Sequence, residues 1–377
     1  MPAPRDPTPS EQAEKDRLKR ERLEHVRHQR SRVSSVGGSV DTLVDTLPAS
    51  AQLEHGSTLT YHSSEWELMW LENIDAWQLG RICEALDEQQ SQVRAFLKDT
   101  CSALTDTPWC LIDDSVHQLW YHTLDGRVRA SKPRTVKRVS EIRPVSPSDA
   151  RIWSWFERKN LDTGEVTREF IEPLVSHLRH PLAECGKFGG MFLVDRSYVL
   201  PGSAANKSSY LFDAGASSWS AGYGGPSLSY FAEVWKRHGF EWTRMEAWEG
   251  STTPETFYAT LPNAWKAKVE YHQQWISTSP SKRPFVPSVI AEKIPQDAYV
   301  VFKLDIDAPA VETAIVDYLL AWNELGKIDE FLWEHHVDNY LMAPSWGMFQ
   351  DMSMSIADSY HYFLKLRQHG VRAHSWV

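Results

Sequence analysis

A segment rich in small residues, LFDAGASSWSAGYGG at 211–225, combines an acid with closely spaced glycines. An apolar start runs into Asp213, and Gly215 and Ala216 follow directly. Small residues let backbone N–H groups approach a ligand closely, as the turn after the first strand of a nucleotide pocket does. The segment therefore predicts a strand followed by a ligand-binding turn.

A second strand-like run, FEWTRMEAWE at 240–249, also ends in acids. A helix-like segment beginning at Pro226 separates it from the glycine turn. An acid at the end of the second strand of a nucleotide pocket can accept hydrogen bonds from the ribose hydroxyls. We expect Glu249 in this role, because it lies nearer the expected end of the strand, with Glu246 as the alternative.

Two later apolar runs end in residues that bind or transfer protons. AYVVFKLDIDAP delivers Asp305 and Asp307, and IDEFLWEHHVDN delivers Glu334, His335 and His336. A base that removes a proton from a hydroxyl works best with a pKa near the working pH, and free histidine has a pKa of about 6.5. We therefore expect Asp305 or His335 to act as a base. Asp307 could instead cap the helix that follows it.

Regular alternation of strands and helices must position these residues. Strands are predicted at 210–214, 241–247, 268–276, 299–305, 328–334 and 371–376, and helices at 227–238, 253–260, 286–293, 309–325 and 353–369. This alternation predicts an α/β fold with a mostly parallel, Rossmann-like sheet covered on both faces. The carboxyl ends of parallel strands meet at one edge, so the acids should converge there.

The remainder of the chain predicts a smaller module in front of this domain. Residues 1–40 are rich in proline and charge and predict a solvated tail that is disordered or helical. Residues 41–149 predict a mainly helical module, with a hairpin within VHQLWYHTLDGRVRA and a basic linker at 131–149. We assign 150–377 to the Rossmann-like domain and expect a further helix at 167–180.

Composition excludes several classes of protein. The net charge of −10 argues against a general nucleic-acid binder, which needs clustered Lys and Arg. No run is apolar enough to span a bilayer, and the N-terminus lacks a hydrophobic signal core, so we expect a cytoplasmic protein. The 17 tryptophans are scattered, which favours core packing. The spacing of the four cysteines fits neither a zinc site nor a redox motif.

Residues 205–377 resemble the FkbM-type S-adenosylmethionine-dependent methyltransferases. The resemblance rests on FDAGAS after the first strand, MEAWE after the second, KLDIDA with Glu312 after the fourth, and Glu334-His335 after the fifth. It implies S-adenosylmethionine as cofactor and methyl transfer to an oxygen of a small molecule or glycan. In such a site Asp213, Gly215 and Ala216 would hold the amino-acid end of the cofactor. The chain departs from the family in having Asp307-Ala308 in place of Glu-Gly.

Two other functions remain open on the sequence. Asp305-Ile306-Asp307 has the spacing with which nucleotide-sugar glycosyltransferases hold a divalent metal. A metal in a methyltransferase could instead use Asp305 with Glu334 or His336. The third reading is a non-catalytic binding or structural protein on a methyltransferase-like scaffold, with a protein partner bound through the N-terminal module.

Overall fold

The structure is a computed structural model that describes somewhat under three fifths of the chain. The described residues are 51–53, 57–76, 149–175, 199–204, 207–219 and 227–376, the last range with short gaps, and isolated residues or short strands between 85 and 130. All of them belong to one compact unit, Ala49–Val377. The predicted tail, the four cysteines and nearly all of the basic linker lie outside the described residues.

A six-stranded parallel sheet forms the centre of the described structure. Its strands are β7 (Ser209–Ala214), β8 (Trp242–Trp248), β9 (Val269–His272), β10 (Tyr299–Leu304), β11 (Glu330–Trp333) and β12 (Arg372–Ser375). The spatial order is β12-β11-β10-β7-β8-β9, and every neighbouring pair is parallel. The chain therefore winds outward from β7 to β9 and then reverses, placing β10 on the other side of β7. This is the strand order of a Rossmann-like fold, as the sequence predicts.

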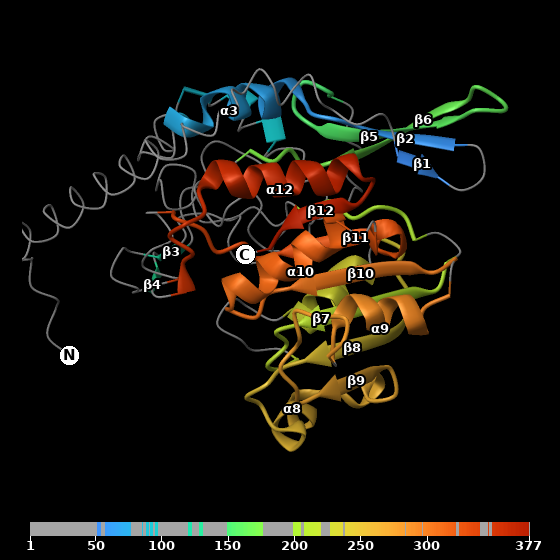
Figure 1. Cartoon of the computed structure of the whole chain (residues 1–377), viewed down its shortest axis with the longest axis vertical. Helices are drawn as coiled ribbons and strands as arrows, with labels where there is room; N and C mark the ends of the chain where they lie inside the picture. The colour runs from blue at the N-terminus through green and yellow to red at the C-terminus, as the bar shows by residue number, and fades with distance from the viewer. Residues whose placement is uncertain are drawn as a thin grey trace, which may run out of the picture. The chain divides into compact units, whose positions relative to one another are not determined.

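Helices cover both faces of this sheet. They are α7 (Ser227–Tyr230), which continues as the π-helix η3 (Phe231–Trp235), α8 (Pro254–Thr260), α9 (Val286–Lys293), α10 (Pro309–Ala321) and α12 (Ile356–Gln368), with the 3-10 turns η4 (Asn263–Trp265) and η5 (Glu324–Lys327). Figure 1 shows α9, α10 and α12 on the near face, where they pack into one hydrophobic core. The second core lies on the other face, under α7, η3 and α8.

Local signals in the sequence explain where these helices begin. Ser355 starts α12 through a capping box, in which its hydroxyl accepts from Asp358 N and its own N–H donates to the Asp358 carboxylate. Thr253 caps α8, and Pro254 occupies the first helical position. Most described tryptophans are buried in the two cores, as expected.

A four-stranded antiparallel sheet is built from residues far apart in the chain. Its strands, in spatial order, are β1 (Ala51–Leu53), β2 (Ser57–His62), β5 (Ser154–Asn160) and β6 (Val166–Ile171). Helix α3 (Glu65–Ala76) follows β2 and buries Trp66, Trp70 and Ile74 along one side. The hairpin expected within 116–130 is confirmed as β3 (Trp120–His122) paired with β4 (Val128–Ala130).

The helix expected at 167–180 is wrong, because its first part is β6. A tight turn sets the hairpin: the Asn160 side chain accepts from the N–H groups of Asp162 and Thr163, and Gly164 adopts a φ of 72°. Strand β5 then pairs with β2 on its other side. This part of the expected domain 150–377 therefore pairs with the module before it.

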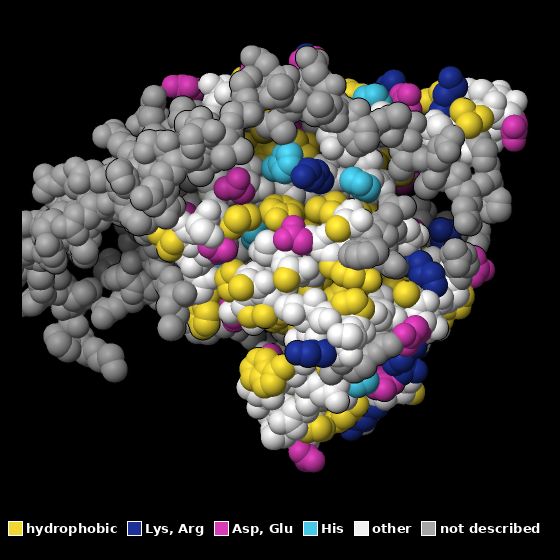
Figure 2. Space-filling model, in the orientation of Figure 1, with side chains coloured by type: hydrophobic (Ala, Val, Ile, Leu, Met, Phe, Trp, Pro, Cys, Tyr) yellow, Lys and Arg dark blue, Asp and Glu magenta, His cyan; other side chains and the backbone are white. Residues whose placement is uncertain are grey.

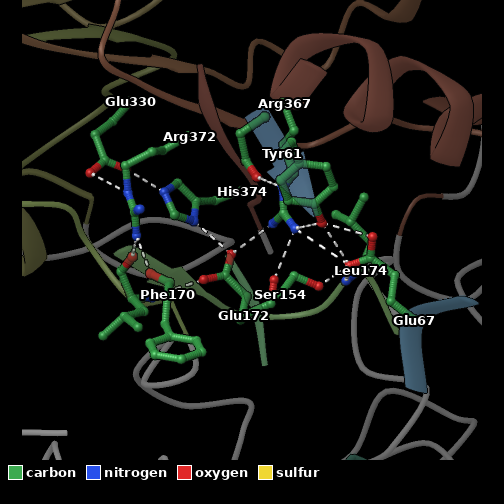
Figure 3. Close-up of polar contacts among 12 residues, drawn as sticks. Tyr61, Glu67, Ser154, Phe170, Glu172, Leu174, Glu330, Arg367, Arg372 and His374 are labelled. Atoms are coloured by element: carbon green, nitrogen blue, oxygen red, sulfur yellow. Dashed lines mark hydrogen bonds and ion pairs between the residues drawn. The ribbon is translucent and has the colours of Figure 1, made fainter. Parts of the chain in front are cut away.

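A buried ionic network, here called the charged seam, joins the antiparallel sheet to β11, β12 and α12 (Figure 3). Its carboxylates are Glu67, Glu172 and Glu330, and its cations are Arg367, Arg372 and His374. All six side chains are almost fully buried. Three negative and three positive groups thus balance in a region from which water is largely excluded.

Arg367 makes the connections across the seam. Its Nε donates to Ala373 O at 2.9 Å, and its NH1 donates to Tyr61 Oη at 2.8 Å and to Glu172 O at 2.9 Å. Glu67 sits on the far side, where it accepts from Tyr61 Oη at 2.7 Å and from Leu174 N at 2.7 Å. The planar guanidinium suits this set of separated acceptors.

His374 lies between two carboxylates of the seam. Its Nδ1 is 2.6 Å from Glu172 Oε1, and its Nε2 contacts Glu330 Oε2. Only the imidazolium can donate from both nitrogens. Burial opposes this charge, but Glu172 and Glu330 outweigh burial and raise the pKa of His374 above its ordinary value.

We expect His374 to make stability fall at alkaline pH. Because its folded-state pKa is raised, its contribution is complete below the unfolded pKa of about 6.5 and is lost as pH rises through the folded-state pKa. His374→Asn should lower the free energy of unfolding by roughly 3 to 5 kcal/mol near pH 6. The difference in this free energy between the variant and the unmodified protein should become smaller as pH rises. Urea unfolding between pH 6 and pH 10 measures this.

His369→Asn is the matched control, because His369 is exposed at the end of α12 and bonds only to its own helix in the described contacts. It should behave as the unmodified protein does. A destabilisation by His374→Asn that stays constant across the pH range would contradict a charged His374.

Candidate functional site

The point of winding reversal, between β7 and β10, carries the groups predicted to do chemistry. In open parallel sheets, ligands bind beyond the carboxyl ends of the strands at this point. Asp213 lies directly opposite Lys303 in the register of the two strands. Asp305 follows β10 and donates its backbone N–H to Ala214 O at 3.0 Å. The structure therefore brings Asp213 and Asp305 together, as expected from the sequence.

Gly215 allows the ends of β7 and β10 to meet. It has a φ of 102°, and a Cβ placed on it would lie 1.5 Å from Asp305 O. The N–H groups of Gly215 and Ala216 both donate to Trp248 O, at 2.9 and 3.2 Å. These amides were expected to hold a cofactor, but here they bind the turn to the end of β8. Gly215 and Ala216 thus shape the floor of the site.

Lys303 bridges the two aspartates. Its Nζ lies 3.2 Å from Asp213 Oδ1 and 2.9 Å from Asp305 Oδ2, and both Lys303 and Asp213 are buried. Trp376 covers this group, because its Nε1 donates to Asp305 Oδ2 at 3.0 Å while its ring stacks on Phe231. Lys303 lies inside β10 and Asp305 directly after it, and their side chains meet at the carboxyl end of the strand.

Glu334 extends the site from β10 to β11. It hydrogen-bonds with Asp305, and its Oε1 accepts from Trp346 Nε1 at 2.9 Å. The net pKa of Asp305 is raised to about 6. Burial is the largest cause; the charge of Lys303 opposes it, and Glu334 adds to it. Asp305, which forms an acid pair with Glu334, can therefore exchange a proton near neutral pH.

His336, and not His335, faces this acid pair. His336 Nε2 lies 3.6 Å from Glu334 Oε1 and 3.8 Å from Asp307 Oδ1. Burial opposes its charge, but the acids around it, chiefly Glu334, raise its pKa. Asp307 is the only described non-glycine residue with positive φ, 55°, and its side chain is exposed.

His335 points in a different direction, into the core under α12. Its Nδ1 bonds with Ser359 Oγ at 2.9 Å, and its ring stacks on Trp333 at 3.8 Å between centroids. These two neighbours in the sequence therefore point apart: His335 packs into the core, and His336 is the histidine beside Glu334.

The two acids of the second strand separate in the same way. Glu249 follows β8 at the carboxyl edge, where its Oε1 accepts from Ser251 N at 2.8 Å. Glu246 lies inside β8 and is surrounded by Arg244, Lys293 and His272, at 3.0 to 3.3 Å. Burial raises the pKa of Glu246, but hydrogen bonds from His272 and Lys293 and the charges of Lys293 and Arg244 outweigh burial, so the net direction is down.

Glu246 instead lines a groove of about 710 Å³ at the start of β8 and β9. Arg244, Lys268 and Lys293 contribute to the same wall. This groove lies toward the amino ends of the strands, away from Gly215 and Asp305. Of the two acids, Glu249 is therefore the one that lies at the carboxyl edge of the sheet, where the sequence predicts a ribose-binding acid.

The alternative metal set does not form a centre in the structure. Asp305 contacts Lys303 and Trp376, whereas Asp307 faces His336. Among the described residues, no group of three or more His, Cys, Asp or Glu has the arrangement of a metal site.

Comparison with models of known families, with curated proteins and with solved structures gives no significant match for this chain. None of the described helices is long and apolar enough to cross a membrane. On the face drawn in Figure 2, described acidic, basic and hydrophobic side chains are interspersed.

Proposed function

We propose that this protein is an S-adenosylmethionine-dependent methyltransferase that acts on a hydroxyl group of a small molecule or glycan. The observation that carries the proposal is a group of buried acids at the winding reversal of a Rossmann-like sheet, two of which, Asp305 and Glu312, have pKa values raised to about 6 and about 7. Four carboxyl groups (Asp213, Asp305, Glu312 and Glu334) face two cations (Lys303 and His336). The excess of acid favours a positively charged ligand.

The residues present fit a sulfonium cofactor. Asp213 is fully buried and ion-paired with Lys303, yet neither of its oxygens accepts a hydrogen bond within the described part of the chain. Glu249 would bind the ribose hydroxyls. Trp275 lies beside Glu249, where it packs on Gly250, and its side chain is 71% exposed. Its ring could stack on the adenine of the cofactor.

The remaining work of the site is positioning and proton removal. S-adenosylmethionine supplies an electrophilic methyl group when bound, so the protein must align a hydroxyl oxygen and accept its proton. The Asp305–Glu334 pair is suited to accept that proton, because Asp305 has a pKa of about 6. His336 lies beside Glu334, and the exposed Asp307 lies beside His336, so a proton could pass from the acid pair toward solvent.

A panel of ligands tests the proposal by thermal melting of the full chain. S-adenosylhomocysteine alone should raise the melting temperature by several degrees, because a ligand at about 100 times its Kd stabilises the folded state by about 2.7 kcal/mol. A shift only with a UDP-sugar and Mn²⁺ would favour the glycosyltransferase. No shift with either would favour a non-catalytic scaffold and overturn the proposal.

Glu249 and Glu255 provide the matched variants for this measurement. Glu249→Ala should weaken the shift, since the loss of hydrogen bonds to a charged group costs about 1.5 to 3 kcal/mol. Glu255→Ala removes an exposed acid of α8 and should leave the shift unchanged. Equal effects of the two substitutions would remove Glu249 from the site.

A further inference from the structure

The turn between β10 and α10 carries both aspartates of the site, and one side chain holds it. Glu312, in the first turn of α10, accepts from Ile306 N at 2.9 Å and from Ala308 N at 3.3 Å through Oε1. Its Oε2 accepts from Trp333 Nε1 of β11 at 2.9 Å. Asp307, with its positive φ, lies between the two turn amides.

We propose that Glu312 is a positioning residue whose ionisation controls the site: the carboxylate fixes the Asp305–Asp307 turn for ligand binding, and its protonation loosens that turn. This inference rests on the proposed function for its effect on the cofactor. Its structural part concerns the turn alone.

The chemistry follows from the donors around Glu312. Three N–H groups converge on one carboxylate, and a carboxylate is acceptor-only. A protonated carboxyl group must place its own hydrogen on an oxygen that already accepts, so at least one of the three contacts weakens. Contacts with the turn or with Trp333 therefore differ between the two forms.

The surroundings place this change close to physiological pH. The net pKa of Glu312 is raised to about 7. Burial is the largest cause; His336 opposes it, and Asp305 adds to it. The amide of Ile306 and the indole of Trp333 favour the ionised form. Ionisation lowers stability as pH rises from about 4.5 to 7, because the folded state holds the proton more tightly than the unfolded state.

The first measurement does not need a cofactor. In the ¹⁵N-labelled full chain, the indole N–H signal of Trp333, identified by its loss in Trp333→Phe, should titrate with a midpoint near pH 7. Glu312→Gln keeps the shape of the side chain but cannot ionise, so it should abolish that titration. A signal that does not titrate, or titrates equally in Glu312→Gln, would overturn the inference.

The second measurement follows S-adenosylhomocysteine affinity between pH 6 and pH 8. If binding needs ionised Glu312, the Kd should be about tenfold higher at pH 6 than at pH 8. Trp333→Phe removes a donor to the carboxylate and should move the midpoint upward even if Glu312→Gln fails to fold. A Kd independent of pH would overturn the control of binding. No binding at any pH would refute the methyltransferase, while the indole titration would still decide the role of Glu312.

Discussion

Replacing Gly215 with alanine should lower the free energy of unfolding by roughly 3 to 5 kcal/mol and abolish the melting shift with S-adenosylhomocysteine. The new Cβ would meet Asp305 O at 1.5 Å, on a backbone with φ of 102°. The oxygen belongs to the backbone and the backbone fixes the position of the Cβ, so no side-chain rotation relieves the contact. The ends of β7 and β10 must separate, which breaks the bond from Asp305 N to Ala214 O. Urea unfolding gives the stability.

Gly239→Ala separates the steric effect from the conformational one. Gly239 also has a positive φ, 85°, but a Cβ there meets nothing within 4 Å. This variant should cost only about 1 to 2 kcal/mol and should keep the ligand-induced shift. Equal losses of unfolding free energy in the two variants would show that the close contact between the turn and Asp305 does not contribute to stability.

Arg367→Met should destabilise the protein by roughly 3 to 5 kcal/mol, because it leaves the buried Glu67 without its cation and removes one of the two cations at Glu172. Methionine keeps an unbranched apolar chain, so most of the loss reports the charge and hydrogen bonds. Glu67 lies in α3, which follows β2, and Glu172 directly follows β6. Chemical unfolding at neutral pH measures the change.

Arg168→Met is the control on the same sheet. Arg168 pairs with Glu157 at 3.3 Å, but its side chain is 55% exposed, and such pairs contribute at most about 1 kcal/mol. Arg367→Lys should rescue little, since one ammonium cannot reach the separated acceptors of the guanidinium. An Arg367→Met variant as stable as the unmodified protein would contradict this prediction, because hydrophobic packing could then replace the charged seam.

The Rossmann-like sheet was predictable because its signals are local. Each strand is a short apolar run bounded by turn residues, and helices such as Val286–Lys293 coincide with the predicted 286–293. Residues 166–171 were not predictable in this way. Their strand is set by a turn at Asn160 and by pairing with β5, which pairs in turn with β2, about 100 residues earlier.

The site was predictable in part for the same reason. Asp213 lies near the end of β7, Glu249 and Asp305 directly follow β8 and β10, and parallel strands bring such residues to one edge. The choice between His335 and His336 was not accessible, because both follow β11, which ends at Trp333, where the alternation of a strand no longer applies. The exact direction of each ring depends on Ser359 and Phe349, which come from other segments.

The charged seam has a consequence for how this protein folds. Tyr61 and Arg367, which bond across it, are 306 residues apart in the chain. Contacts between such distant residues form slowly, because a long loop must close before they gain any energy. The parallel sheet should therefore assemble before the antiparallel one attaches, and amide exchange should reveal β2, β5 and β6 opening together as a separate cooperative unit.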